Sequence, residues 1–141
     1  MPCRLFLVCW YFKLRLIIGK IHYLCKMKQF FLAADKIKRL IEPMGYCIAS
    51  DRITVDGGKV GYMYREKGDE PADSGWRFFE GSENQEYADE PSHFGLYDVN
   101  TIANYDREII PLLDSPVGSA FERTSTGLQA VPEGFQAFQR R

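Results

Sequence analysis

The sequence predicts an α+β domain in which one main helix near the N-terminus packs on a small antiparallel sheet, with short helical turns in the connections. Two observations lead to this fold class. Apolar residues recur every three or four positions over residues 30–44, which is the period of one helix face. Downstream the period changes to two, in short runs bounded by turn-forming residues, as in antiparallel strands.

The predicted helix spans residues 31–42. Asp35 favours its positively polarised N-terminal end, and the Lys and Arg residues at positions 36–39 are expected to face water. Pro43 cannot continue the helix, and Gly45 can adopt the left-handed conformation that ends one.

Strands are expected to follow directly. Residues 46–50 form the first strand, and residues 53–55 and 60–64 are predicted to form a hairpin. The Asp-Gly-Gly run at residues 56–58 supplies the positive φ angles that a tight hairpin turn needs. The polar stretch at residues 66–73 is predicted to be a loop.

A further strand is predicted at residues 76–79. Alternation places Trp76 and Phe78 on one face and Arg77 and Phe79 on the other. The sequence leaves open whether Trp76 and Phe78 belong to the core or to a recognition surface. Because unpaired charges are costly to bury, we expect Arg77 and Asp98 to be exposed or paired with each other.

The remaining elements are shorter. Residues 82–94 are expected to form an exposed loop with at most a helical turn, and residues 96–102 an extended segment. Residues 106–110 are predicted to form a short capped helix that Pro111 opens or kinks, and residues 117–122 a closing strand. The tail after Arg123 has too little apolar pattern to place.

Length and charge limit what this fold can be. A chain of 141 residues can bury a core without disulfides or a structural metal. The net charge of -1 conceals an asymmetry, because residues 1–43 contain nine Lys/Arg and two Asp/Glu, whereas residues 44–141 contain nine and seventeen. The two parts therefore carry about +7 and -8.

The first 26 residues differ in composition from the rest of the chain. They are basic and apolar, but their apolar runs do not exceed eight residues, too short to span a membrane. No small-residue cleavage site suits a signal peptide. Our hypothesis is that these residues are an over-extended gene start and that one domain occupies residues 27–141. The scattered cysteines favour an intracellular, cytoplasmic protein.

Catalytic and cofactor chemistry finds little support in the sequence. The two histidines are His22 and His93, so a nucleophilic centre would have to combine His93 with Cys47 or a loop serine. Metal ligands do not occur in the two close pairs that a structural zinc needs. Gly57-Gly58-Lys59 lacks the spacing of a phosphate-binding loop. We therefore expect no enzyme activity, cofactor or metal.

The middle of the chain is acidic and aromatic. Residues 66–98 contain ten Asp/Glu and two cations, with large aromatic residues among them. Such a surface attracts a basic protein partner by steering at long range and by aromatic anchors at short range. It disfavours direct nucleic-acid binding, which requires a basic face.

Long, non-repetitive stretches of this chain resemble a bacterial family, immunity protein family thirty-three, first described as a domain of unknown function. The stretches cover most of residues 45–123. They are residues 47–57, 59–66, 74–79, 97–105 and 116–123.

The resemblance implies a non-catalytic, cytoplasmic immunity protein of a polymorphic toxin system, which binds and neutralises a bacterial toxin domain. The acidic middle adds the hypothesis that this toxin is a nuclease, because carboxylates can occupy a basic groove made for phosphates. No membrane partner is expected. Residues expected to form or support the interface are Asp73, Trp76, Arg77, Tyr97, Asp98 and Asn100.

Two other functions remain open on the sequence alone. One is a metabolic or regulatory domain that binds a small ligand in a pocket lined by Trp76, Tyr62 and Asn100. The other is a structural module that pairs with itself.

Overall fold

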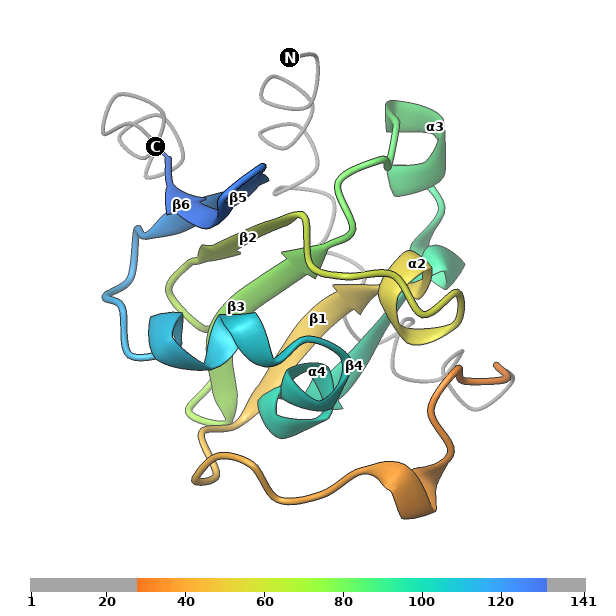
Figure 1. Ribbon diagram of the computed structural model, residues 1–141, viewed down its shortest axis with the longest axis horizontal. Coiled ribbons are helices and arrows are strands. Elements are labelled where there is room, and N and C mark those ends of the chain that lie inside the picture. The colour runs from red at the N-terminus through yellow and green to blue at the C-terminus, as the bar shows by residue number, and fades with distance from the viewer. Residues whose placement is uncertain (1–27, 132–141) are drawn as a thin grey trace.

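The computed structural model describes residues 28–131, which form a six-stranded mixed sheet with short helices (Figure 1). The strand order is β4-β1-β3-β2-β5-β6. The strands are β1 (Tyr46–Ser50), β2 (Tyr62–Arg65), β3 (Asp73–Phe79), β4 (Phe94–Asp98), β5 (Ala120–Thr124) and β6 (Gly127–Ala130).

The sheet is mixed rather than purely antiparallel. β1 and β3 are parallel, and the other neighbouring strands are antiparallel. The α+β class is confirmed, but the prediction of a small antiparallel sheet is wrong. The reason is topological: β2 follows β1 in the chain yet pairs with the far side of β3, so β3 returns between them in the direction of β1.

Short helices connect the strands. The α-helices are α2 (Asp51–Thr54), α3 (Gln85–Ala88) and α4 (Val99–Tyr105). The 3-10 helices are η2 (Ala34–Lys36), η3 (Pro91–His93) and η4 (Arg107–Leu112). Apolar residues of α2, α4 and η4 pack on one face of the sheet in a single cluster, in front of the strands in Figure 1.

The predicted main helix at residues 31–42 is wrong. Residues 30–44 instead form a largely extended segment, which we call the strap, and η2 is its one helical turn. An isolated helix of this length is marginal in water, so tertiary contacts decide its conformation. Here the backbone amides of Lys38, Leu40 and Ile41 donate to side chains of α4 instead of to carbonyls of their own segment.

The hairpin predicted at residues 53–64 is also wrong. Ser50 caps α2 by accepting the Arg52 amide, and the amide of Gly57 then donates to the Ile53 carbonyl at 3.0 Å. Gly57 has φ of 81°, so the glycine that signalled a hairpin turn ends a short helix instead. The chain makes its tight hairpin between β5 and β6, where Thr124 pairs with Gly127.

Other predictions hold to different degrees. The strand at residues 46–50 is confirmed as β1, and the strand at 76–79 lies within β3. The prediction of an extended segment at residues 96–102 is wrong beyond Asp98. The Asp98 carboxylate accepts the Asn100 amide and caps the N-terminal end of α4, which begins at Val99. Asp106 caps η4 as predicted, with Pro111 inside it. The closing strand begins at Ala120, three residues later than expected.

Each face of the sheet has its own apolar cluster. Trp76 and Phe78 are fully buried against the helices, which answers the question that the sequence left open. Tyr62, Tyr64 and Phe79 belong to the cluster on the opposite face. Within residues 28–131, no helix has the length and apolar character needed to cross a membrane.

Candidate functional site

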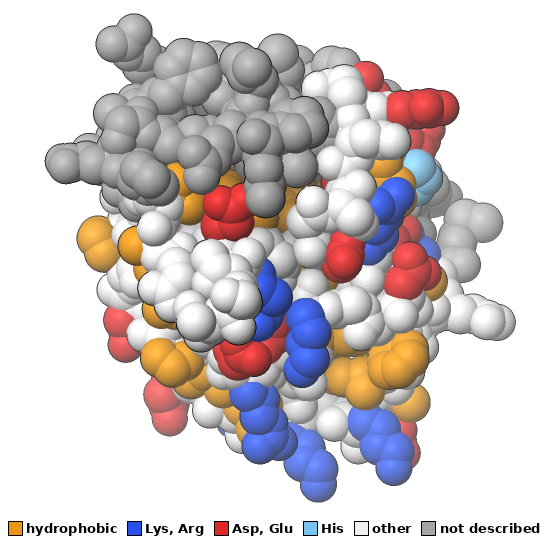
Figure 2. Space-filling view, turned by 45° about the horizontal axis from the view of Figure 1, so that its top comes forward, with side chains coloured by type: hydrophobic (Ala, Val, Ile, Leu, Met, Phe, Trp, Pro, Cys, Tyr) orange, Lys and Arg blue, Asp and Glu red, His pale blue; other side chains and the backbone are white. Residues whose placement is uncertain are grey.

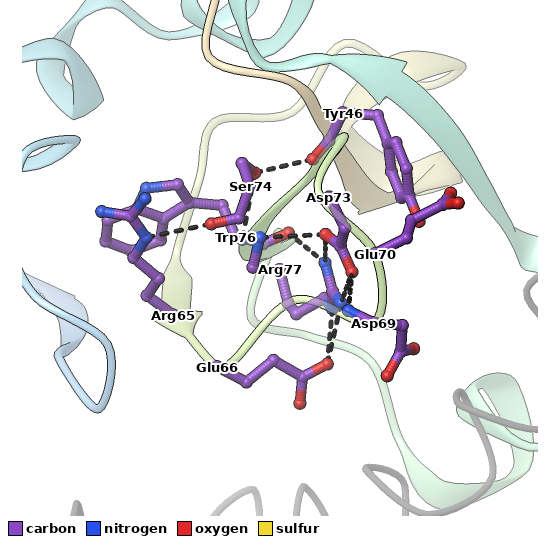
Figure 3. Close-up of polar contacts among 10 residues, drawn as sticks. Tyr46, Arg65, Glu66, Asp69, Glu70, Asp73, Ser74, Trp76 and Arg77 are labelled. Carbon is purple, nitrogen blue, oxygen red and sulfur yellow. Dashed lines mark hydrogen bonds and ion pairs between the residues drawn. The ribbon is translucent and has the colours of Figure 1, made fainter.

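A buried arginine lies in the second half of β3, among the residues predicted to serve recognition (Figure 3). The Arg77 side chain has no exposed surface. Its guanidinium donates to both carboxylate oxygens of Asp73 at 2.8 and 2.9 Å, and its Nε donates to Glu66 Oε1 at 2.9 Å. Nη1 also donates to the Trp76 carbonyl at 3.0 Å. These contacts meet the condition for burying such a charge, because the guanidinium is both paired and hydrogen-bonded.

The charges in this network fix each other's ionisation. Burial would raise the pKa of Asp73, but the hydrogen bonds and positive charge of Arg77 outweigh it and hold that pKa below its usual value. Burial would lower the pKa of Arg77, but Asp73 and Glu66 raise it instead. The Arg77–Asp73 pair therefore stays ionised at neutral pH, so the ion pair persists under these conditions.

The network closes the base of the loop at residues 66–72. Asp73 Oδ2 accepts the Asp69 amide at 3.1 Å, and the Glu66 amide donates to the Gly75 carbonyl at 2.9 Å. Gly75 has φ of 84°, and a Cβ atom there would overlap the Glu66 carbonyl oxygen. The loop is therefore held closely against β3 at both of its ends.

This loop presents carboxylates to solvent. Asp69 and Glu70 are exposed, and the Tyr46 hydroxyl donates to Glu70 Oε1 at 3.0 Å. Burial, followed by the nearby Asp73 and Glu70 charges, raises the pKa of Tyr46. Tyr46 pairs with Asp73 of β3 on one side and with Asp98 of β4 on the other. We call Asp69, Glu70 and Asp98 the acidic end of the sheet.

Arg77 and Asp98 were expected to be exposed or paired with each other; Asp98 is exposed, whereas Arg77 is neither exposed nor paired with Asp98. β1 lies between the strands that carry these residues, and Arg77 is already occupied on its own side. Asp98 is 44% exposed, contacts Arg39 at 3.6 Å and caps α4. Among the six predicted interface residues, Asp98 is therefore the one with an exposed charge.

Trp76 and Tyr97 take different positions. Trp76 Nε1 donates to the Leu113 carbonyl at 3.1 Å, and its ring stacks on Phe78. Its place is in the core, so any contribution to an interface is indirect. Tyr97 is half-buried, and its hydroxyl lies 3.3 Å from Thr54 Oγ1. The edge-to-face contact of its ring with Phe30 reaches the surface of the strap.

Asn100 is occupied by the strap. It is buried, its Oδ1 accepts the amides of Leu40 and Ile41 at 2.7 and 3.2 Å, and its Nδ2 donates to the Lys38 carbonyl at 2.9 Å. The pocket suggested for Trp76, Tyr62 and Asn100 is not formed. Tyr62 belongs to the cluster on the opposite face of the sheet from Trp76, and the polar atoms of Asn100 already bond the backbone.

The residues considered for nucleophilic chemistry take part in packing and hydrogen bonding. Cys47 is fully buried, and burial raises the pKa of its thiol. His93 Nδ1 lies 2.8 Å from the Tyr87 carbonyl, and its ring stacks on that tyrosine at 4.0 Å. Within residues 28–131, no group of three His, Cys, Asp or Glu residues is arranged to hold a metal ion.

Charge is distributed in separate groups on the face that Figure 2 shows. Asp and Glu side chains occur in several places with cations between them, and Lys and Arg side chains gather along the lower edge. The described residues contain eleven Lys/Arg and eighteen Asp/Glu. On this face, the acidic side chains therefore occur in separate local groups and do not form one continuous surface.

Sequence reasoning missed the residues that connect the buried network to the surface. The sequence pattern did not indicate Glu66 as a partner of Arg77, or Tyr46 as a partner of Glu70. Asp73 and Arg77 are four residues apart in β3, but the sequence pattern placed Asp73 in a predicted loop, so strand alternation could not indicate their pairing. The contact with Glu66 depends on pairing between β2 and β3, for which the sequence holds no local signal.

The α+β fold holds a charged surface loop in place through buried ion pairs and hydrogen bonds. Recognition of a partner requires side chains whose positions are fixed in this way, so the arrangement suits a small binding protein. The family model of the immunity protein Imm33 domain matches residues 47–130, and the chain belongs to this family. The matched region runs from β1 to β6 and includes the whole Arg77 network. No curated protein and no solved structure matches the chain.

Proposed function

We propose that this protein is a non-catalytic immunity protein that binds a bacterial toxin domain in the cytoplasm and blocks its activity. Membership of the Imm33 family is the observation that carries the proposal. The proposed role also suits the exposed carboxylates of Asp69 and Glu70, which lie on a loop held by buried charges.

The acidic end of the sheet is the proposed contact surface. Asp69 and Glu70 lie on a loop whose base is bonded to a buried arginine, so few conformations have to be lost when a partner binds. Fixed charges of this kind increase affinity because their ordering cost is met during folding. Asp73, Arg77, Trp76 and Asn100 then support the interface from beneath, while Tyr97 and Asp98 contribute at its margin.

A nuclease is the proposed class of toxin. Its groove for a phosphate backbone is basic, and a rigid group of carboxylates can occupy the places of phosphates. This proposal makes the interaction sensitive to salt. The exposed carboxylates of this protein attract the basic side chains of the toxin across solvent, and dissolved ions screen that attraction. The steering should act mainly on the association rate.

The test begins with capture on the full chain from native cells, followed by purification of the toxin domain that is retained. Wild-type protein should bind it stoichiometrically and suppress its hydrolysis of DNA or RNA. Capture of no toxin from cells shown to express one would contradict the immunity role. A captured toxin without nuclease activity would contradict the finer proposal alone.

Matched variants locate the contact surface. Asp69→Asn with Glu70→Gln removes two charges from the acidic end. Glu86→Gln with Asp89→Asn removes two from α3 and its C-terminal cap, which lie beyond the opposite end of β3 (Figure 1). The first pair should weaken toxin binding at low salt by roughly tenfold or more, whereas the second should leave it within about twofold. Equal effects of the two pairs would show that net charge matters and the acidic end does not.

A further inference from the structure

Two consecutive phenylalanines on the strap are exposed. Phe30 is 40% exposed and Phe31 is 64% exposed, and Val117 is the one other large apolar residue that is exposed within residues 28–131. Single apolar residues are common on protein surfaces, whereas contiguous apolar patches mark sites of contact with other molecules. The aromatic pair is therefore a candidate contact site.

Phe31 is held in place although most of its side chain is exposed. Its amide donates to the Thr54 carbonyl at 2.9 Å. The Leu32 amide donates to the Tyr105 hydroxyl at 3.1 Å, and this hydroxyl donates to the same Thr54 carbonyl at 2.7 Å. The Phe31 ring lies against Gly57, where an added Cβ atom would come within 2.7 Å of it. A ring supported in this way loses little freedom when a partner covers it.

The aromatic pair adjoins the surface proposed for toxin contact. The Phe30 ring makes an edge-to-face contact with Tyr97 of β4, with 5.8 Å between the ring centroids. The next residue of β4 is Asp98, whose exposed carboxylate belongs to the acidic end. β4 is an edge strand, so no further strand of the described sheet lies beyond it. Tyr97 and Asp98 therefore connect the aromatic pair to the acidic end along one edge of the sheet.

The charged residues near the pair are of both signs. Asp56 and Lys59 are exposed on either side of the glycines at residues 57–58, and Lys28 is paired with Asp51 at 2.7 Å. A membrane surface or a nucleic acid would favour a cationic rim. An apolar centre with a polar rim is typical of a contact between proteins. The surroundings of the pair therefore favour a protein partner.

From these observations we propose that Phe31, supported by Phe30, is the apolar anchor of the toxin contact, which extends from the acidic end along β4 to the strap. This inference rests on the proposed immunity function. The partner that fits is a toxin domain with an apolar pocket beside its basic surface. The carboxylates act on the encounter, and the Phe31 ring fills the pocket in the formed complex, so its contribution is mainly to the dissociation rate.

The first test is hydroxyl-radical footprinting of the free full chain, which needs no toxin. Phe31 should be oxidised much faster than the buried Phe78, at every protein concentration. Protection of Phe31 that grows with concentration would assign the patch to a second copy of the chain. Protection at every concentration would assign it to residues 1–27 of the same chain. Either result would overturn the anchor and leave the immunity proposal standing.

The second test measures binding of the purified toxin domain that the full chain retains. Phe31→Ala should raise the dissociation rate constant by roughly tenfold and leave the association rate constant within about twofold. Val117→Ala is the matched control, because Val117 is 56% exposed and precedes β5, which three strands separate from β4. It should leave both rate constants within about twofold of the wild type.

The two proposals fail in different ways. An unchanged dissociation rate in Phe31→Ala, with binding that Asp69→Asn and Glu70→Gln still weaken, would overturn the anchor alone. Equal effects of Phe31→Ala and Val117→Ala would do the same, since the position of the ring would then not matter. Retention of no toxin from cells shown to express one would contradict the immunity function, and the anchor with it.

Discussion

At the scale of single residues, the Arg77 guanidinium illustrates why a buried charge is sensitive to the loss of its partner. Each of its contacts with Asp73 and Glu66 is short, and neither carboxylate is more than slightly exposed. Such a network need not be more stable than an apolar replacement of the entire group. Removing one member, however, leaves the remaining charges in surroundings that solvate them poorly.

We therefore expect Arg77→Met to lower the free energy of unfolding by about 3–5 kcal/mol, because Asp73 and Glu66 would lose the cation that they contact. Urea denaturation measures this change. Arg39→Met is the control: Arg39 is 55% exposed and its contact with Asp98 is 3.6 Å, so its loss should cost less than about 1 kcal/mol. Similar costs for the two variants would show that the network does not stabilise the fold.

The ionisation of Asp73 predicts how stability changes in acid. Its pKa is lower in the folded than in the unfolded protein, so its stabilising effect is complete above the unfolded value of about 4 and is lost as the pH falls towards the folded value. Unfolding free energies measured between about pH 6 and 2.5 should therefore fall more steeply for the wild type than for Asp73→Asn. Parallel curves would assign the acid sensitivity to other carboxylates.

At the scale of elements, the loop at residues 66–72 depends on glycine as much as on charge. Gly75 has φ of 84°, and a Cβ atom added there would overlap the Glu66 carbonyl. Gly127 has φ of 115°, and a Cβ atom added there would lie 3.8 Å from its nearest neighbour, Glu108 Oε2. Both glycines adopt the left-handed region that other residues avoid. Their main difference is the steric contact that a Cβ atom would make.

This pair separates backbone strain from close packing. Gly127→Ala should be destabilised by about 1 kcal/mol from the unfavourable φ angle, and Gly75→Ala should lose clearly more because the Glu66 carbonyl must also move. Thermal denaturation measures both variants. In Gly75→Ala, the Asp69 amide should also lose protection from exchange, since the base of the loop is displaced. Equal stabilities of the two variants would contradict the close-packing argument.

Element by element, local signals predicted structure where local contacts decide it. The strand at residues 46–50, the alternation of residues 76–79 and the Asp106 cap of η4 are confirmed by the structure. The strap was misread because its extended form depends on Asn100 and Asn104, sixty or more residues away. The 56–58 turn was misread because a left-handed glycine suits both a hairpin and a helix end.

At the scale of the whole molecule, the candidate site could be predicted only in part. The six residues predicted to form or support the interface lie in β3, β4 and the start of α4. Two of them, Asp73 and Asp98, are near each other because both pair with Tyr46 of β1, which lies between their strands. Their depth could not be read from the sequence, because acidic and aromatic residues suit a surface and a satisfied interior equally well. The strand order decided that Arg77 and Trp76 are buried and that Asp69 and Glu70 are outside.

The excess of carboxylates also predicts how the molecule meets its partner. The whole chain carries a net charge of -1, but residues 28–131 contain eleven Lys/Arg and eighteen Asp/Glu, so the local field of this part should attract the proposed basic toxin and accelerate association. Stopped-flow measurements between about 0.05 and 0.5 M NaCl should show the association rate constant falling by roughly tenfold or more, with a much smaller change in the dissociation rate constant. Asp69→Asn with Glu70→Gln should flatten this dependence more than Glu86→Gln with Asp89→Asn, because steering is strongest for charges near the contact. A salt effect confined to dissociation would mean that the carboxylates act within the formed complex and do not guide the encounter.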